Sequence, residues 1–587
     1  MNLRSSLSSK WPEGVPDEII GFNKPLFSIL DNSAREFPEA VYTMFQGASR
    51  NFRQVRDTAD RISNFLVSEG LVKGDRVAVF LPNIPHYPAI FFGILKAGCV
   101  CVTCNPLYKA AELNLQLKDS GAKAVFVMDH PGFYQTALDS IKQTNVRTVV
   151  ICGIKSYLPV IKGIMGSLLG KIPKAEGHEN GHFIFESIVK AFSPDPPKIE
   201  INPVKDYALI LYTGGTTGIP KGAALTHANL MSNVMSMEEW IRIPETTGGP
   251  PIKLRKGGEH TFLGVLPWYH AFGLTLCMLT SCITSSRLVC VPDPRAGRPP
   301  FSDVLKSIRK YNITIVIAVP TIYNALVNQP LTKKLDLSSI RACGSGAAPM
   351  PAELIRKFEA MTGCIIFEGY GLTETSPVVT ANPTNIEQRK IGSVGLPLPG
   401  VEIKIIDLAD EMKDLSEGED GEIAVSGPQI MAGYWNKKEE NDLVFRDISG
   451  KRFFLTGDIG HLDQDGFLVI TDRKKDMIVV GGFNVYPADV EGVLYSHPKI
   501  SQAAVIGVPD KECGELVKAF VQLKPGTDVT AEEIIDFCKE NMAAYKRPRI
   551  IEFRESLPTS PVGKVLRRVL KDEERDMRNQ SSQQGLH

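Results

Sequence analysis

The sequence predicts an α/β protein in which helices cover a parallel β-sheet, followed by a smaller unit of mixed helices and strands. The first observation is that helix-like and strand-like apolar patterns alternate from the start of the chain, as is typical of parallel sheets. The second is a change in sequence pattern at the charged run 472–476, which separates a predicted hairpin from a compact unit of strands and helices. We therefore place the domain boundary at this run.

The alternation is clearest near the N-terminus. One face of a predicted helix carries Val55, Ala59, Ile62, Phe65 and Leu66. The following stretches predict a strand at 76–81, a core helix, turn and strand within 88–103, a helix near 110–118 and strands at 122–128 and 207–211. The apolar region 88–103 contains Lys96 and is too short to span a bilayer.

The composition is that of an ordinary globular protein. Hydrophobic residues make up 43% of the 587 residues, so a large core can form. Lys plus Arg equals Asp plus Glu at 66 each, which gives no electrostatic argument for nucleic acid. Cys101 and Cys104 lie in an apolar run and are expected to be buried strand residues rather than a metal or redox pair. No secretory signal is recognised, and a cytoplasmic location is expected.

Residues 157–174 form an apolar insert with interspersed lysines. A helix packed on the body of the protein is the favoured interpretation. A helix lying on a membrane surface, with the lysines on its polar face, is the alternative. Residues 195–197 and 244–258 are predicted to be connectors because they are rich in Pro or Gly.

The stretch YTGGTTGIPKGA, beginning at Tyr212, follows a predicted buried strand. It is not a Walker A loop, because Pro220 precedes Lys221 and no Ser or Thr follows that lysine. Glycine N–H groups, hydroxyls and a lysine nevertheless suit an anion. The concentration of donors predicts a phosphate-binding loop.

Two other stretches carry suitable chemistry. Residues 368–377 place an aromatic ring, hydroxyls and Glu374 in one loop, so that the ring could stack a nucleobase and the carboxylate could hold magnesium. Asp458 follows a predicted strand and suits ribose hydroxyls.

The C-terminal part has its own pattern. Residues 460–470 predict a hairpin, residues 517–523 a strand, and Thr530-Ala-Glu-Glu the capped start of a helix. The last fifteen or so residues are polar and are expected to be disordered, from about residue 575 onward.

Taken together, these stretches resemble the adenylate-forming superfamily of acyl-CoA synthetases, most closely long-chain fatty-acid–CoA ligases. The resemblance rests on YTGGTTGIPKG, GYGLTE, TGD, DRKKDMIVVGGFNVYP and PTSPVGKVLRR, and it covers nearly the whole chain. It implies a large domain, residues 1–471, of two doubly wound α/β subdomains plus a distorted β-barrel. A hinge at 472–476 and a small mobile α+β domain at 477–587 would follow.

The resemblance also implies roles for individual residues. Phosphate-loop residues would be Thr213, Gly214, Gly215, Thr216, Thr217, Gly218 and Lys221. Residues around adenine would be Gly346, Ala347, Ala348 and Tyr370, and residues at the ribose would be Asp458 and Arg473. Further ATP-binding residues would be Gly371 and Thr373. Thr217 and Glu374 would position Mg²⁺. Residues lining the CoA tunnel would be Gly481, Gly482 and Phe483, and the hinge pivot would be Lys475.

Two further residues are implied near the reacting atoms. Lys564 would reach the substrate carboxylate and the α-phosphate, where positive charge offsets repulsion between two anions. His270 would lie beside the acyl pocket. The neighbouring Arg567 and Arg568 are expected to be surface charges.

The implied activity uses ATP and CoA to convert a fatty acid to acyl-adenylate and then to acyl-CoA. A medium-chain or aryl acid, or a carrier protein in place of CoA, stays open. Amino-acid activation is disfavoured because residues 268–274 carry no aspartate, and a non-catalytic scaffold is disfavoured because Lys564 and Glu374 are present. Light-emitting chemistry is not excluded. No nucleic-acid partner is expected, and peripheral membrane contact and a homodimer stay open.

Overall fold

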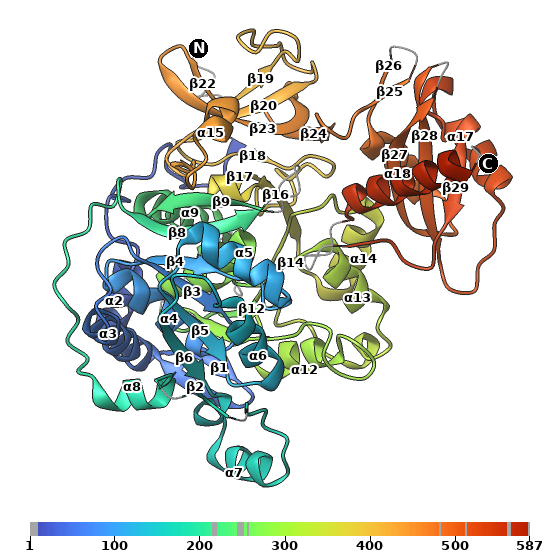
Figure 1. Ribbon diagram of the computed structural model, residues 1–587. Helices are drawn as coiled ribbons and strands as arrows, with labels where there is room; N and C mark the ends of the chain where they lie inside the picture. Colours follow the sequence, from blue (N-terminus) through green and yellow to red (C-terminus); the bar gives the residue numbers. More distant parts are fainter. Residues whose placement is uncertain are drawn as a thin grey trace.

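The computed structural model describes residues 10–175, 177–179, 181–213, 220–243, 252–254, 257–480, 483–510, 513–559 and 565–584. It contains a large N-terminal domain and a smaller C-terminal domain, which lies at the right of Figure 1. The predicted α/β class, with its large and small domains, is confirmed.

The first large sheet has eight strands in the order β21-β9-β8-β4-β3-β5-β6-β7. Its six strands from β8 to β7 pair in parallel, and β9 and β21 add to one edge in antiparallel fashion. Their bounds are β3 Arg76–Phe80, β4 Val100–Thr103, β5 Ala124–Met128, β6 Thr148–Cys152, β7 Phe183–Ile184, β8 Tyr207–Thr213, β9 Lys221–Thr226 and β21 Gly433–Tyr434.

Helices cover both faces of this sheet because its strands alternate buried side chains to each side. In β3, Val77 and Val79 join the main core, whereas Ala78 and Phe80 join a second cluster with α5 and α6. The helices connected with this part of the chain are α2 Ser28–Glu36, α3 Phe52–Ser68, α4 His86–Lys96, α5 Ala110–Ser120, α6 Pro131–Ser140, α8 Phe185–Ala191 and α9 His227–Trp240. Cys101 and Cys104 are buried, as predicted.

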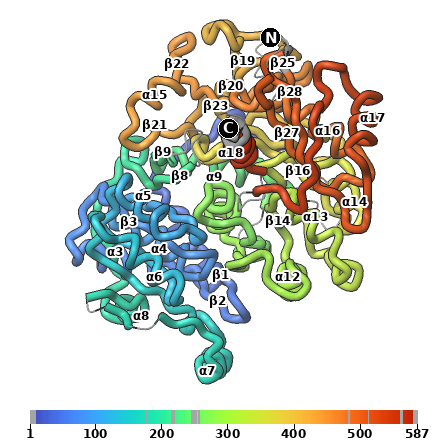
Figure 2. The backbone as a smooth tube through the Cα atoms, turned by 45° about the vertical axis from the view of Figure 1, so that its right-hand side comes forward, coloured from blue at the N-terminus to red at the C-terminus, as the bar shows by residue number. Residues whose placement is uncertain are grey.

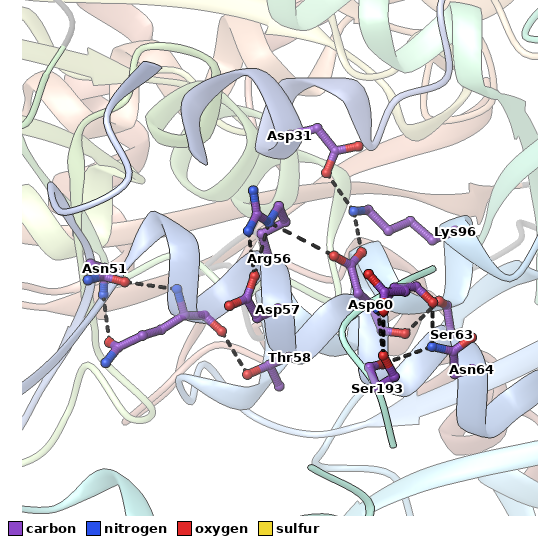
Figure 3. A network of polar contacts seen from close by, with 12 residues as sticks. Asp31, Asn51, Arg56, Asp57, Thr58, Asp60, Ser63, Asn64, Lys96 and Ser193 are labelled. Atoms are coloured by element: carbon purple, nitrogen blue, oxygen red, sulfur yellow. Dashed lines mark hydrogen bonds and ion pairs between the residues drawn. The ribbon is translucent and has the colours of Figure 1, made fainter. Parts of the chain in front are cut away.

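Helices α3 and α4 pack closely and share a buried ionic network (Figure 3). A Cβ atom at Gly93 would lie 2.8 Å from the carbonyl oxygen of Ala59, so only glycine allows this approach. Lys96, on α4, pairs with Asp31 of α2 and Asp60 of α3. Burial raises the pKa of Asp60 to about 6, even with Lys96 beside it. The network ties three helices together beneath the first sheet.

The second large sheet has nine strands in the order β18-β17-β16-β15-β14-β12-β13-β1-β2. The strands from β16 to β1 pair in parallel. Their bounds are β1 Val41–Phe45, β2 Ala48–Asn51, β12 Thr261–Gly264, β13 Arg287–Cys290, β14 Ile315–Ala318, β15 Ala342–Ser345, β16 Ile366–Gly371, β17 Val378–Ala381 and β18 Leu396–Pro397. Helices here are α10 Ala271–Gly273, η3 Leu274–Leu279, α11 Thr280–Ile283, α12 Ser302–Lys310, α13 Pro320–Asn328 and α14 Ala352–Thr362, with turns η4 Thr332–Lys334 and η5 Thr373–Thr375.

A five-stranded antiparallel sheet stands where the distorted β-barrel was predicted. Its strands are β19 Glu402–Ile406, β20 Gly421–Ser426, β22 Phe445–Ile448, β23 Lys451–Leu462 and β24 Leu468–Arg473, and α15 Lys438–Val444 precedes β22. The predicted hairpin is the β23–β24 pair. A short pair, β10 Arg242–Ile243 and β11 Ile252–Lys253, completes the large domain; the predicted connector 244–258 falls largely outside the described residues.

The C-terminal domain has a sheet and core of its own. Its strands are β25 Ile478–Val480, β26 Phe483–Val485, β27 Ile500–Asp510, β28 Gly514–Leu523 and β29 Ile550–Phe553, and its helices are α16 Pro487–Ser496, α17 Ala531–Asn541 and α18 Arg567–Gln584, with turn η6 Ala544–Lys546. Thr530 forms the predicted capping box with Glu533.

Helix α18 extends to Gln584 and so includes much of the stretch expected to be disordered, an expectation that stays a prediction. Its apolar anchor is Leu570, which is buried against the small domain. Lys518 binds Glu574 at 2.6 Å, and Arg554 binds Glu573 at 3.1 Å. Charged partners on β28 and after β29 therefore hold the first turns of this helix.

The insert forms a helix, α7 Val160–Leu168, preceded by the turn η2 Ile154–Tyr157. The favoured interpretation, a helix packed on the body, is wrong, because Gly163 is the buried residue of α7 and its apolar side chains are exposed. Figures 1 and 2 both show α7 projecting from the end of the large domain. Within the part of the chain that the structure describes, no helix is long and apolar enough to cross a membrane.

Candidate nucleotide and acyl site

Predicted site residues gather where parallel strands of both large sheets end. Strand β8 ends at Thr213, β15 at Ser345 and β16 at Gly371. Ligand sites in open α/β sheets lie outside the carboxyl ends of the strands. This topology therefore brings the two ends of the phosphate loop, residues 346–348 and residues 370–374 to neighbouring edges.

The two ends of the phosphate loop are held by strand pairing. Thr213 of β8 stands opposite Lys221 of β9, and its hydroxyl donates to the Lys221 carbonyl at 3.4 Å. Lys221 forms an ion pair with Glu440, and its Nζ lies 5.4 Å from the centre of the Tyr434 ring. Gly214, Gly215, Thr216, Thr217 and Gly218 lie outside the described residues.

Tyr370, Asp458 and Arg473 are brought together from three strands. The Tyr370 hydroxyl donates to Asp458 Oδ2 at 2.7 Å, and Arg473 Nε lies 2.7 Å from Asp458 Oδ1. Asp458 and Arg473 are register partners in β23 and β24. Burial, together with the Asp458 charge, raises the pKa of Tyr370, which therefore stays a neutral donor. The carboxylate is thus fixed on both oxygens.

The loop after β15 lies against β16 and the segment that follows His270. A Cβ atom at Gly346 would lie 3.2 Å from both the Gly369 carbonyl oxygen and the Phe272 ring. Ala347 has a left-handed backbone with φ 67°, and Ala348 follows it, a conformation that costs energy for a residue with a side chain. Gly346 is thereby placed beside Gly369, the residue before Tyr370 in β16.

Glu374 lies in the turn η5 and is 8% exposed. The Tyr434 hydroxyl donates to Glu374 Oε1 at 2.7 Å. Burial raises the pKa of Glu374, while this hydrogen bond works in the opposite direction. Since Tyr434 also contacts Lys221, it links the predicted phosphate and magnesium residues.

Tyr434 was missed by the sequence analysis. Its strand, β21, pairs with β9, and Tyr434 stands opposite Ala223. The glycine and aromatic residues at 433–435 were the available signal, but nothing local in that stretch indicates which distant carboxylate the hydroxyl meets.

Close backbone approaches shape the turn that carries Thr373 and Glu374. A Cβ atom at Gly371 would lie 1.8 Å from the Pro377 carbonyl oxygen, so glycine is required there. The Leu372 N–H donates to that same carbonyl at 3.1 Å. Gly371 therefore sets the path of the chain through residues 372–377.

His270 caps the N-terminus of the short helix α10, where its Nδ1 accepts from the Phe272 N–H at 3.3 Å. The preceding segment is anchored through Asn83, whose side chain accepts from the Trp268 N–H at 2.9 Å. Beyond α10, the Thr275 hydroxyl donates to the Ser376 carbonyl at 3.0 Å. The segment after His270, which was expected beside the acyl pocket, is therefore a neighbour of the segment at Ser376.

The predicted hinge lies where the chain leaves the sheet of the large domain. Strand β24 ends at Arg473, and β25 of the C-terminal sheet begins at Ile478. Lys475 lies between them and is exposed. Phe483 begins β26, whereas Gly481, Gly482 and Lys564 fall outside the described residues.

The expectation that Arg567 and Arg568 are surface charges is wrong for Arg567. Arg568 is a surface charge, with a side chain 55% exposed. Arg567 is not, because its side chain is 18% exposed and forms ion pairs with Asp472, Asp476 and Glu491 at 3.5, 3.4 and 2.5 Å. These three acidic side chains raise the pKa of Arg567 against the opposing effect of burial.

Comparison with known proteins agrees with this fold. The model of the AMP-binding enzyme family matches residues 30–435, and that of the AMP-binding enzyme C-terminal domain matches residues 489–564. The chain belongs to the AMP-binding enzyme family.

Individual relatives cover nearly the whole chain. A long-chain-fatty-acid–CoA ligase from Bacillus subtilis (strain 168) is 39% identical over 572 residues, 96% of this chain and 97% of the relative. A long-chain-fatty-acid–CoA ligase from Escherichia coli O157:H7 is 36% identical over 575 residues, which cover 97% of this chain and 98% of the relative. The crystal structure of an anthranilate CoA ligase in complex with anthranoyl-AMP has a TM-score of 0.80 at 26% identity, covering 95% of this chain and 99% of that one.

Proposed function

We propose that this protein is an AMP-forming ligase that joins long-chain fatty acids to CoA. The observation that carries the proposal is 36–39% identity, over 96–97% of this chain, to relatives named long-chain-fatty-acid–CoA ligase. In the first step a carboxylate oxygen attacks the α-phosphorus of ATP, and the bond to the bridging oxygen breaks to release pyrophosphate. In the second step the CoA sulfur attacks the acyl carbon, AMP leaves, and the thiol proton is lost.

The main obstacle in the first step is repulsion between the carboxylate and the phosphates. Positive side chains can offset it and stabilise the transition state. We assign this role to Lys564. The loop from Thr213 to Lys221 is assigned to binding the β- and γ-phosphates. His270 is assigned to the acyl pocket, and Gly481, Gly482 and Phe483 to the CoA tunnel.

Asp458, Tyr370 and Arg473 are assigned to the adenosine part of ATP. Asp458→Asn keeps the shape of the side chain but removes the charge that pairs with Arg473. Because hydrogen bonds to charged groups contribute roughly 1.5–3 kcal/mol, we expect KM for ATP to rise by about tenfold or more. KM for the fatty acid should stay within about twofold, as measured by pyrophosphate release. A change in KM for the acid alone would show that the pocket is misassigned.

Glu374 and Thr217 are assigned to Mg²⁺, a hard cation that prefers oxygen ligands. The buried carboxylate of Glu374, fixed on one oxygen by Tyr434, is a fitting donor. When bound with ATP, the ion would neutralise phosphate charge. Glu374→Gln is expected to raise the Mg²⁺ concentration required for half-maximal adenylation by roughly tenfold. Unchanged Mg²⁺ dependence, with ATP held saturating, would contradict the assignment.

The acyl-pocket segments favour an apolar acid. Residues 270–274, 317–321 and 377–379 offer mostly apolar side chains and no acidic residue for the far end of a substrate. A panel of acids from acetate to oleate, scored by pyrophosphate release with and without CoA, tests the proposal. The highest kcat/KM should fall among the long chains, and thioester should form only with CoA. A maximum for short or aryl acids would favour the alternative substrates.

Transfer to a carrier protein is the alternative for the second step. Adenylate formation without thioester formation in the same panel would favour it. A homodimer stays a prediction that mass measurement in solution can test.

A further inference from the structure

Helix α7 presents an unpartnered apolar surface. Its stripe residues, with exposed fractions of 77, 72, 53, 55, 81 and 61%, are Val160, Ile161, Ile164, Met165, Leu168 and Leu169. These positions recur at i, i+1, i+4, i+5, i+8 and i+9, so they follow one side of the helix. Singly exposed hydrophobic residues are ordinary, but a contiguous apolar patch marks a surface that contacts something.

The stripe points outward because the other side of α7 is tied to the large domain. Gly163 is buried, and a Cβ atom there would lie 3.5 Å from the Lys155 carbonyl oxygen. Lys162, which borders the stripe beside Leu169, donates to the Gln46 carbonyl at 2.8 Å. Tyr157, just before α7, is buried under the Arg50 guanidinium, which lies 4.8 Å from its ring centre. These contacts join α7 and the turn before it to Gln46 and Arg50 of the large domain.

The charged residues of the insert itself all have the same sign. Residues 154–175 contain Lys155, Lys162, Lys171 and Lys174 and no acidic residue, and all four lysines are exposed. Lys310 of α12 adds to this set, since both Lys162 and Lys310 lie 4.0 Å from a Cβ built at Gly47. An apolar stripe rimmed by lysines matches the acyl boundary and the anionic headgroups of a bilayer. Two copies of the stripe facing each other would bring like charges together.

We propose that α7 docks the protein on an anionic lipid surface, with the stripe entering the headgroup–acyl boundary and the lysines contacting the headgroups. The projection of α7 beyond the rest of the large domain, seen in both views (Figures 1 and 2), lets a flat surface reach it without obstruction. This contact is independent of the reaction assigned above.

The test uses the full chain and vesicles of phosphatidylcholine with and without phosphatidylglycerol, with binding measured by co-sedimentation. We expect the wild type to bind the vesicles containing phosphatidylglycerol more tightly. The stripe variant I161S/I164S/M165S/L168S should lose about tenfold or more of this affinity. Replacing Lys171 and Lys174 with glutamine should weaken binding by roughly fivefold per lysine, on anionic vesicles only.

A matched control replaces four comparably exposed hydrophobic residues elsewhere, Val72, Val204, Ile386 and Met412, with serine. This variant should bind vesicles as the wild type does, and unchanged thermal unfolding of both serine variants should show that folding is intact. Failure of the wild type to bind, or equal binding by the stripe variant, would overturn the proposal. A dimer that dissociates in the stripe variant, with vesicle binding unaltered, would assign the stripe to a second copy and also overturn it.

Discussion

Replacing Lys564 with alanine is expected to slow acyl-adenylate formation by about 10²-fold or more, the scale for losing one partner of a developing oxyanion. The lysine is assigned to stabilising the transition state in which a carboxylate attacks the α-phosphate. Its charge is therefore expected to affect the transition state more than ATP binding. KM for ATP should therefore change little compared with kcat. Pyrophosphate release without CoA measures this half-reaction alone.

The second half-reaction provides the internal control. Given pre-formed acyl-adenylate, the Lys564→Ala variant should still form acyl-CoA at close to the normal rate, because the lysine is assigned to the first step only. Arg568→Ala is a matched variant, since Arg568 is a nearby exposed cation, and it should leave both rates unaltered. Equal loss of the two half-reactions in Lys564→Ala would contradict the assignment.

Much of the fold could be predicted because its signals are local. The helical face from Val55 to Leu66 lies within α3, and the apolar run that begins at Arg76 is β3. The capping box at Thr530 marks the start of α17. In each case the residues that determine the element lie within it or next to it, so one window of sequence contains the information.

Contacts between distant residues could not be predicted in the same way. Tyr434 meets Glu374 across 60 residues, and Lys221 meets Glu440 across 219. Arg567 was expected at the surface because an arginine in a polar stretch usually is, yet Glu491 binds it across 76 residues. Such pairs depend on how sheets and domains come together, which no local pattern records.

Helix α7 shows a different limit. Its apolar residues with interspersed lysines predicted a helix, and the helix is present. The same composition fits burial against a protein core or contact with lipid, because both environments favour an apolar side on a helix. Only the tertiary structure distinguishes the two, by showing that the stripe faces away from the body.

The last prediction concerns how one site can serve two reactions. Lys564 and the tunnel residues around Gly481 belong to the same small domain but are assigned to different steps. A rigid domain cannot place both at the site at once, so we expect it to turn about Lys475, between β24 and β25.

The observed contacts identify what such a turn would break. Asp472, on the large-domain side of Lys475, accepts from the Ala488 N–H at 2.8 Å and pairs with Arg567 at 3.5 Å. Arg567 also pairs with Asp476 and Glu491, which lie beyond the pivot and would move with it. A rotation at Lys475 would therefore exchange two polar contacts of Asp472 for water without opening a hydrophobic core.

Lys475→Pro is expected to leave one half-reaction close to normal and to slow the other, the CoA step, by about 10²-fold. Proline fixes φ near −65° and removes an N–H, which restricts rotation at the pivot. Lys475→Ala is the matched control, because it removes the same side chain but leaves the backbone free, and it should support both steps. Adenylate formation and thioester formation are measured separately on each variant. Rates within about twofold of wild type for both steps of the proline variant would place the hinge elsewhere, and equal slowing in the alanine variant would assign the effect to the lysine side chain rather than to the backbone.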